Sequence, residues 1–250
     1  MSNFLQDLKP GSCKFGTWVK LGTLETLELL ALAGFDFVVV DMEHAPHTFE
    51  SAYRCIVSAQ GFGMRALVRL PDSNGSYVQR ILDSGADGVL VPRVRDAQEA
   101  RQVMDGMIFS PTGTRGLGIT SRAGHWGLKP TAQYVEEGNA QVFRGVQLED
   151  QSALRDVDSI LDVPGVNAAF VGPGDLALSS GKPASHPENA ALIDALLVTT
   201  RARGIPCGTA VGDAAAARQA SERGFSFVMV SNDITMFGKA AADLVRGFKG

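Results

Sequence analysis

The chain has few cysteines, no block of basic residues and no long apolar run. Its three cysteines, Cys13, Cys55 and Cys207, are scattered and lack C-x-x-C spacing. This pattern does not support a disulfide framework, and we expect reduced thiols in a cytoplasmic protein. The net charge is −4, and no stretch interleaves basic with aromatic residues, which argues against a nucleic-acid partner.

Signals for membrane insertion and export are also missing from the sequence. The apolar runs, such as residues 35–40, are far shorter than the roughly 20 residues that a membrane-spanning helix needs, so no membrane partner is expected. Residues 1–7 do not place a basic segment before an apolar one, so we expect no signal peptide. The chain has 250 residues, 45% hydrophobic and 20% charged, which is the composition of a globular protein able to bury a full core.

Short runs rich in β-branched residues alternate with longer amphipathic stretches. The expected strands are residues 14–19, 35–41, 66–70, 88–91, 143–148, 168–172, 205–210 and 225–231. The expected helices are residues 24–33, 49–60, 76–84, 96–107, 152–161, 187–203, 213–223 and 235–248. Strict alternation of this kind favours βαβ units and a parallel sheet. Eight units in one chain of this length predict an α/β fold, a (β/α)8 TIM barrel that forms a single domain over residues 1–250.

One long segment, residues 109–139, does not fit the repeat. Ordered connections of this length are usually functional or lie at an interface. Part of it, residues 130–138, is compatible with a helix.

Charged and amide side chains follow several of the predicted strands, at the end where such barrels place their active sites. Glu149 and Asp175 come directly after two consecutive strands, so their carboxylates converge on one rim if the strands are parallel neighbours. Hard oxygen ligands of this kind suit Mg²⁺ or Mn²⁺. Period-two alternation turns Gln147, Glu149 and Arg69 toward the barrel axis. An ion pair between Arg69 and Glu149 that only closes the barrel is the structural alternative.

Two further features of the predicted mouth point to chemistry. His44 is flanked by Asp41 and Glu43, and a carboxylate neighbour suits a histidine for acid–base work. The turn Gly172-Pro173-Gly174 before Asp175 offers backbone N–H groups that can bind carboxylate or phosphate oxygens. A tight strand-to-helix turn without a ligand is the simpler interpretation of this turn.

Six ordered motifs together carry a resemblance that runs over nearly the whole chain. They are residues 37–46, 68–69, 88–92, 111–116, 147–149 and 170–176. In these motifs the chain resembles the HpcH/HpaI aldolase family, the class II, metal-dependent pyruvate aldolases on a TIM barrel. Its members include 2,4-dihydroxyhept-2-ene-1,7-dioate aldolases and 2-keto-3-deoxy-sugar-acid aldolases.

The resemblance implies a role for each site residue. It implies that Glu149 and Asp175 hold a divalent cation (Mg²⁺, Mn²⁺ or Co²⁺), that His44 transfers protons and that Arg69 contacts the keto oxygen of the substrate. By the same resemblance Gln147, Gly172, Gly174 and Asp175 bind substrate, and Asp41 and Asp83 support the histidine and its water. Asp83 ends a predicted helix, so it could reach a site only across a subunit contact. Relatives are usually hexamers, trimers of dimers, so a homo-oligomer is expected.

The implied reaction makes or cleaves a C–C bond between a 2-oxo acid, pyruvate or hydroxypyruvate, and an aldehyde through a metal-stabilised enolate. Oxaloacetate decarboxylation and citrate-lyase-type cleavage on the same metal site remain alternatives, although the E-H-x-P stretch that contains His44 favours the aldolase. A class I aldolase would need a desolvated lysine. Only Lys20 lies near the carboxyl end of a strand, and we expect it at an exposed helix entry. A non-catalytic barrel would leave the inward polar cluster unexplained.

Overall fold

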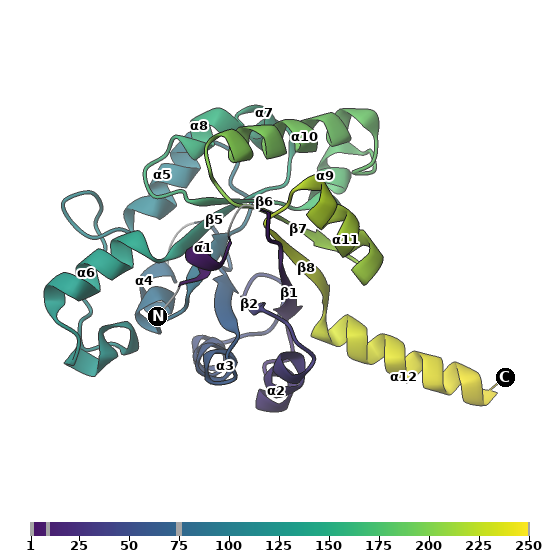
Figure 1. The fold of residues 1–250 in the computed structure, drawn as a ribbon, viewed down its shortest axis with the longest axis horizontal. Coiled ribbons are helices and arrows are strands. Elements are labelled where there is room, and N and C mark those ends of the chain that lie inside the picture. Colours follow the sequence, from purple (N-terminus) through teal and green to yellow (C-terminus); the bar gives the residue numbers. More distant parts are fainter. Residues whose placement is uncertain (1–2, 9–10, 74–76, 250) are drawn as a thin grey trace.

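The computed structural model describes residues 3–8, 11–73 and 77–249, and in this part of the chain eight parallel strands close into a barrel (Figure 1). The strands follow one another around the barrel in sequence order, and β8 pairs with β1. They are β1 (Lys14–Val19), β2 (Phe37–Asp41), β3 (Arg65–Arg69), β4 (Gly88–Val91), β5 (Phe143–Leu148), β6 (Ala168–Val171), β7 (Cys207–Val211) and β8 (Phe227–Asn232). The prediction of a single α/β domain with a TIM barrel is therefore confirmed.

Helices follow the strands in the predicted alternation. They are α2 (Leu24–Leu32), α3 (Phe49–Gly61), α4 (Val78–Asp83), α5 (Ala97–Asp105), α7 (Gln151–Arg155), α8 (Val157–Leu161), α10 (Pro187–Ala202), α11 (Ala214–Arg223) and α12 (Asp233–Lys249). Side chains cap many of their N-termini: Thr23, Thr48 and Asp96, for example, each accept a hydrogen bond from a backbone N–H in the first turn. Such caps satisfy donors that the helix itself leaves unpaired, so each strand is followed by a defined helix start.

The structure departs from the predicted elements at several places. The second strand begins at Phe37, two residues late, and the side chain of Asp36 just before it accepts hydrogen bonds from Lys14 and Phe15. The helix predicted over residues 152–161 is two short helices that meet at Asp156, whose φ of −97° and ψ of 18° are not helical. Residue 76, where another helix was predicted to begin, lies outside the described residues, and α4 is described from Val78.

Elements that the alternation does not predict also occur. They are α1 (Phe4–Asp7), the 3₁₀ helix η1 (Arg122–Gly127), α6 (Thr131–Ala140) and α9 (Pro173–Ser180). The helix expected within residues 130–138 is thus confirmed as α6. None of the helices within the described ranges is long and apolar enough to cross a membrane.

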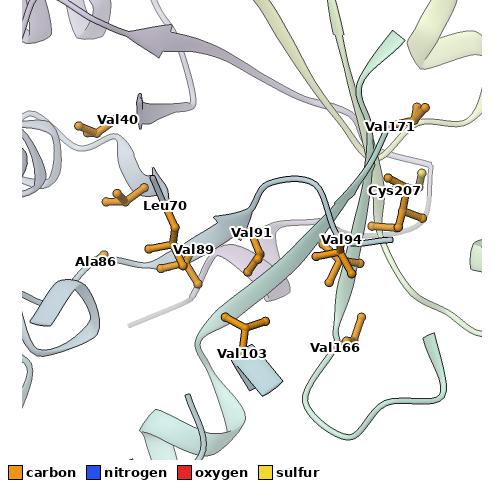
Figure 2. Close-up of a cluster of buried hydrophobic side chains, with 14 of the residues drawn as sticks. Val40, Leu70, Ala86, Val89, Val91, Val94, Val103, Val166, Val171 and Cys207 are labelled. Atoms are coloured by element: carbon orange, nitrogen blue, oxygen red, sulfur yellow. The ribbon is translucent and has the colours of Figure 1, made fainter. Parts of the chain in front are cut away.

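Two apolar cores hold the barrel together. Valines on the outer faces of the strands, such as Val40, Val89 and Val171, form a core with the surrounding helices, as Figure 2 shows. Inside the barrel, the rings of Phe37, Phe143 and Phe227 pack together with Phe4 of α1. Glycines on neighbouring strands make room for these rings: a Cβ on Gly208 would lie 2.1 Å from the Phe227 ring. Aromatic rings thus fill the interior of the barrel, and the polar side chains that point inward lie at the carboxyl ends of the strands.

The last helix leaves the barrel. Figure 1 shows α12 extending away from β8 toward the C-terminus, with its far end apart from the other helices. Its apolar side chains Ile234, Phe237, Leu244 and Phe248 are spaced so that they share one face, and all of them are exposed.

Candidate active site

A buried ion pair joins the carboxyl ends of β2 and β3. Asp41 and Arg69 are partners in the strand register. Arg69 donates from Nε to Asp41 Oδ1 at 2.9 Å and from Nη2 to Oδ2 at 2.8 Å. The backbone N–H groups of Glu43 and His44 also donate to Oδ1, at 3.1 Å each. Burial opposes the charge of Asp41, but the hydrogen bonds and charge of Arg69 outweigh it and hold the pKa of this carboxyl below its usual range. The Arg69–Glu149 ion pair considered from the sequence is not formed; Arg69 is bonded to Asp41 instead.

Lys20 is part of the same cluster, so the expectation that it lies at an exposed helix entry is wrong. The residue directly follows β1 and is half-buried. Its Nζ donates to Asp41 Oδ2 and, at 3.3 Å, to the carbonyl oxygen of His44. Its backbone N–H donates to Asp233, which begins α12 and ties β8 to β1. The Nζ atom that a class I aldolase would use to form a Schiff base is thus held in an ion pair with Asp41.

Glu43 connects three basic side chains at the mouth. Its side chain is 6% exposed, and its Oε2 lies 3.0 Å from Nη1 of Arg69. The other oxygen, Oε1, lies 3.2 Å from Nε of Arg93. The His44 ring is exposed at the mouth, with Nε2 at 3.7 Å from Glu43 Oε2. Glu43 is therefore the carboxylate beside the His44 ring, and Asp41 reaches His44 through its backbone N–H.

Glu149 lies in a different electrostatic setting. It is buried beyond the end of β5, where Gln147 donates from Nε2 to its Oε2. Gly172 leaves space for both side chains, since a Cβ there would lie 3.0 Å from Glu149 Oε2. Burial, followed by the charge of Asp175 in the first turn of α9, raises the pKa of the Glu149 carboxyl to about 7. The two carboxylates that follow β5 and β6 are thus close enough to repel each other.

The acidic side chains at the mouth differ in whether a basic side chain neutralises them. Asp41 is paired with Arg69 and Lys20, and Glu43 is flanked by Arg69 and Arg93. Glu149, in contrast, forms no ion pair with another described residue: Gln147 donates to it, the charges of Asp175 and Glu43 oppose its ionisation, and Arg69 acts on it only at longer range. Gln147 also buries Oε1 without a hydrogen-bond partner among the described residues. Two carboxylates and an amide oxygen are donors of the kind that suits a hard divalent cation.

The small number of protein ligands in this donor set suits Mg²⁺, which takes few of them. Within the described ranges, no group of three or more His, Cys, Asp or Glu side chains is arranged to hold a metal ion. A site with only two carboxylates resembles the way Mg²⁺ is bound in many enzymes, because this ion keeps several waters and takes few protein ligands. The residues present therefore fit a hydrated divalent cation.

The turn after β6 forms the start of α9. Gly172 is the N-cap of this helix and Pro173 its first residue, so the N–H groups of Gly174 and Asp175 belong to the unpaired first turn. Such N–H groups and the positive end of the helix dipole favour an anion. The predicted anion-binding turn is thus a helix N-terminus rather than an isolated loop.

The predicted site residues fall into two groups in the structure. Asp41, His44, Arg69, Gln147, Glu149 and Asp175 lie at the carboxyl ends of strands β2, β3, β5 and β6, at the mouth, as do Gly172 and Gly174. Asp83 lies elsewhere. It ends α4, just before β4 begins, and accepts hydrogen bonds from Arg115 at 3.0 Å and Tyr134 at 3.1 Å. The structure does not bring Asp83 to the mouth of its own chain.

The sequence analysis overlooked three residues at the mouth. Lys20 was misplaced, and Arg93 follows β4, a strand whose end was not considered. Trp18 faces inward from β1, and its ring lies 4.2 Å from the guanidinium carbon of Arg69. The alternation of side chains along β1 would have predicted that Trp18 points inward. The position of Arg93 just after the end of β4 would have predicted that it lies at the mouth.

The raised pKa of Glu149 predicts how the stability of the metal-free protein depends on pH. Between about 4.3, the pKa in an unfolded chain, and about 7, the folded protein keeps a proton that the unfolded chain releases, so stability falls as pH rises. Glu149→Gln removes this effect. In EDTA we expect the variant to melt at a higher temperature than the wild type at pH 8, with the difference shrinking toward pH 5. Glu50→Gln, at an exposed carboxylate of α3, is the control. A difference that does not change with pH would contradict the prediction.

Comparisons with known proteins agree with this geometry. Residues 14–240 match the model of the HpcH/HpaI aldolase/citrate lyase family. The chain is 32% identical to a 2-keto-3-deoxy-L-rhamnonate aldolase of Salmonella gallinarum, over 98% of this chain and 92% of that protein. It is 35% identical to a 2-dehydro-3,6-dideoxy-6-sulfogluconate aldolase of Pseudomonas putida, over 97% of this chain and 95% of that protein.

Among solved structures, an HpcH/HpaI aldolase from Desulfitobacterium hafniense superposes with a TM-score of 0.92 at 30% identity, covering 100% of this chain and 97% of that one. Sequence and fold thus agree over almost the whole length, and the resemblance expected from the six motifs is confirmed. The chain belongs to the HpcH/HpaI aldolase/citrate lyase family of carbon–carbon lyases.

Proposed function

We propose that this enzyme is a class II, divalent-metal-dependent aldolase. Its donor would be a 2-oxo acid, pyruvate or hydroxypyruvate, and its acceptor an aldehyde. With pyruvate and a hydroxyaldehyde, the joined product would be a 2-keto-3-deoxy sugar acid like those named for its relatives. One observation carries the proposal: among the described residues Glu149 and Asp175 form no ion pair, whereas Asp41 and Glu43 at the same mouth each pair with Arg69.

Glu149 and Asp175 would hold the metal ion, with the Gln147 amide next to it. When bound, a divalent cation stabilises negative charge on the keto oxygen of the donor as a Lewis acid.

Arg69 would supply a second positive contact at the keto oxygen. Two hydrogen bonds to Asp41 and the Trp18 ring beneath it hold the guanidinium in one orientation. A donor fixed in this way does not have to reorganise when charge develops, and losing one such contact typically lowers the rate by about 10²- to 10³-fold. The first-turn N–H groups of Gly174 and Asp175 would bind the carboxylate of the donor.

His44 would move the protons. Its ring is 59% exposed at the mouth, and Glu43 at 3.7 Å is placed to orient it. In synthesis the imidazole would take a proton from C3 of the donor, and the resulting carbanion would attack the aldehyde carbon. The protonated ring would then return the proton to the new alkoxide oxygen. Cleavage runs the same steps in reverse, so that one residue serves as both base and acid.

Loss of either metal-binding carboxylate tests this proposal. We expect Glu149→Ala and Asp175→Ala to reduce the condensation of pyruvate with an aldehyde by at least about 10²-fold, because each removes charge that holds the cation. EDTA should silence the wild type, and Mg²⁺, Mn²⁺ or Co²⁺ should restore it. Asp194→Ala, at an exposed carboxylate of α10, is the control, and circular dichroism checks that each variant folds.

Full activity of the wild type in EDTA would contradict the metal requirement. Metal-dependent release of CO₂ from oxaloacetate, without consumption of any aldehyde, would instead favour the decarboxylase alternative on the same site.

We also propose that the chain forms a homo-oligomer through α12. A free helix with a continuous apolar face is rarely stable in water, and Phe248 on this face is 91% exposed. The same chain exposes leucines on α2, namely Leu24, Leu29 and Leu32, so a second copy offers an apolar counterpart. The resemblance adds the expectation of a hexamer, in which Asp83 of one chain would serve a neighbouring site.

Sedimentation of the full chain tests this assembly. The wild type should sediment as an oligomer, and the double variant Phe237→Ser/Leu244→Ser should shift toward the monomer because it removes apolar contact area. Lys239→Ser, on the same helix, is the control. A monomeric wild type would contradict the proposal.

A further inference from the structure

Lys20 is a basic residue at the mouth to which the proposed mechanism gives no role. It directly follows β1, and its side chain is only 19% exposed. A lysine near the surface usually keeps its ammonium in water, because ordering and desolvating this group is costly. Here Nζ contacts Asp41, a carboxylate that Arg69 already neutralises with two hydrogen bonds. Neutralising Asp41 therefore does not by itself account for Lys20.

The ammonium of Lys20 connects Asp41 to the backbone of His44. It donates to Asp41 Oδ2 and, at 3.3 Å, to the carbonyl oxygen of His44. The backbone N–H of His44 donates to the other oxygen of Asp41, Oδ1, at 3.1 Å. Both backbone polar groups of His44 are thus held by this cluster, the N–H by Asp41 and the carbonyl oxygen by Lys20.

The ring of His44 has few contacts of its own. It is 59% exposed, and among the described residues Glu43 is the acidic side chain with which it pairs, at 3.7 Å. This distance is longer than a hydrogen bond, so it allows the ring to shift. The position of the imidazole therefore depends mainly on the backbone turn of residues 42–45, to which Lys20 donates.

Asp233, the first residue of α12, fixes the backbone of Lys20. Its carboxylate is buried and accepts the N–H of Lys20 on both oxygens, at 3.0 Å each. One of these oxygens also accepts the N–H of Leu21 at 2.9 Å. Hydrogen bonds to a charged acceptor are stronger than those between neutral groups, so Asp233 holds the start of this segment firmly.

His47 holds the same segment from the side of β2. Its Nε2 lies 3.1 Å from the carbonyl oxygen of Val19, the residue before Lys20. Gly22 approaches the His47 ring so closely that a Cβ would lie 2.7 Å from it, and its φ is +65°. Glycine adopts this conformation at no steric cost. Contacts on both sides therefore fix the segment from which the Lys20 side chain extends.

We propose that Lys20 is a positioning residue that holds the His44 turn in place, and that Asp233 fixes Lys20 for this task. The inference rests on the proposed aldolase function, in which the imidazole takes and returns the proton of donor C3. Proton transfer needs the two heavy atoms within about 2.6–3.2 Å of each other. A misplacement of about 1 Å can lower a rate by about 10²-fold.

This role differs from a purely structural one in what it affects. The donor would be bound by Arg69, by the first turn of α9 and at the metal site, and Arg69 keeps its two hydrogen bonds to Asp41 without Lys20. Loss of Lys20 should therefore slow proton transfer and leave donor binding almost unchanged. If Lys20 only stabilised the fold, its loss would lower the melting temperature and leave proton transfer unchanged.

Exchange of the C3 protons of pyruvate for deuterium in D₂O measures proton transfer without an aldehyde. With Mg²⁺, Lys20→Met should lower kcat of this exchange by about 10- to 100-fold and change KM for pyruvate less than about threefold. Lys20→Arg should retain part of the rate, because a guanidinium can still donate to both acceptors. Lys14→Met is the control, since Lys14 begins β1 at its opposite end and pairs with Asp36 at 3.0 Å. Equal kcat in Lys20→Met and wild type would overturn the proposal.

Asp233→Asn tests the second contact. The variant keeps the size of the side chain but replaces one acceptor oxygen by an NH₂ group, which cannot accept a backbone N–H. It should also lower kcat of the exchange. Because Asp233 acts through Lys20, the double variant Asp233→Asn/Lys20→Met should be no slower than Lys20→Met alone. Losses that multiply in the double variant would overturn the role of Asp233.

Crystal structures of the variants give a readout that does not depend on turnover. In Lys20→Met the turn of residues 42–45 should move by about 1 Å or lose order, and in Lys14→Met it should stay in place. If the wild type exchanges no protons but the turn moves in Lys20→Met, the aldolase proposal fails and the positioning role stands. If the wild type exchanges protons and Lys20→Met neither slows the exchange nor moves the turn, the positioning role fails and the aldolase proposal stands.

Discussion

Charge pairing at the carboxyl end of the barrel organises this protein. A parallel barrel brings the ends of all its strands to one mouth, and here that mouth collects several carboxylates. A buried carboxylate is tolerated only with a partner, and Arg69 supplies it for Asp41 across the strand register. Lys20 and Arg93 extend the pairing outward. Glu149 is the exception: it is buried beside Asp175, and its pKa is raised to about 7.

The same pairing fixes the geometry of the groups that the proposed mechanism uses. Asp41 holds the Arg69 guanidinium with two hydrogen bonds and accepts the backbone N–H groups that shape the turn before His44. Trp18 supports Arg69 from below. A positive group aimed in advance at the keto oxygen lowers the cost of forming an enolate. One carboxylate thus positions both the Arg69 guanidinium and the backbone of His44, the two groups that the proposed mechanism uses.

Much of this could be predicted from the sequence, because strand alternation and strand ends are local patterns. Period two correctly turned Arg69, Gln147 and Glu149 inward, and strand–helix alternation gave the eight-stranded barrel. Other features depend on contacts between distant residues. Lys20 reaches Asp41, 21 residues away, only because β1 and β2 are neighbours. The left-handed backbone conformation of Arg93 could not be predicted, because the position is not occupied by glycine. Asp83 does not lie at the mouth of its own chain, and the position of a neighbouring chain cannot be predicted from a single sequence.

The proposal that Glu149 and Asp175 are metal ligands can be tested directly. A crystal of the full chain soaked with Mn²⁺ and pyruvate, measured at the manganese absorption edge, locates the ion by anomalous scattering. We expect one strong peak at the mouth, at coordination distance, about 2.0–2.6 Å, from carboxylate oxygens of both residues. No peak there, or a peak held by other side chains, would contradict the assignment.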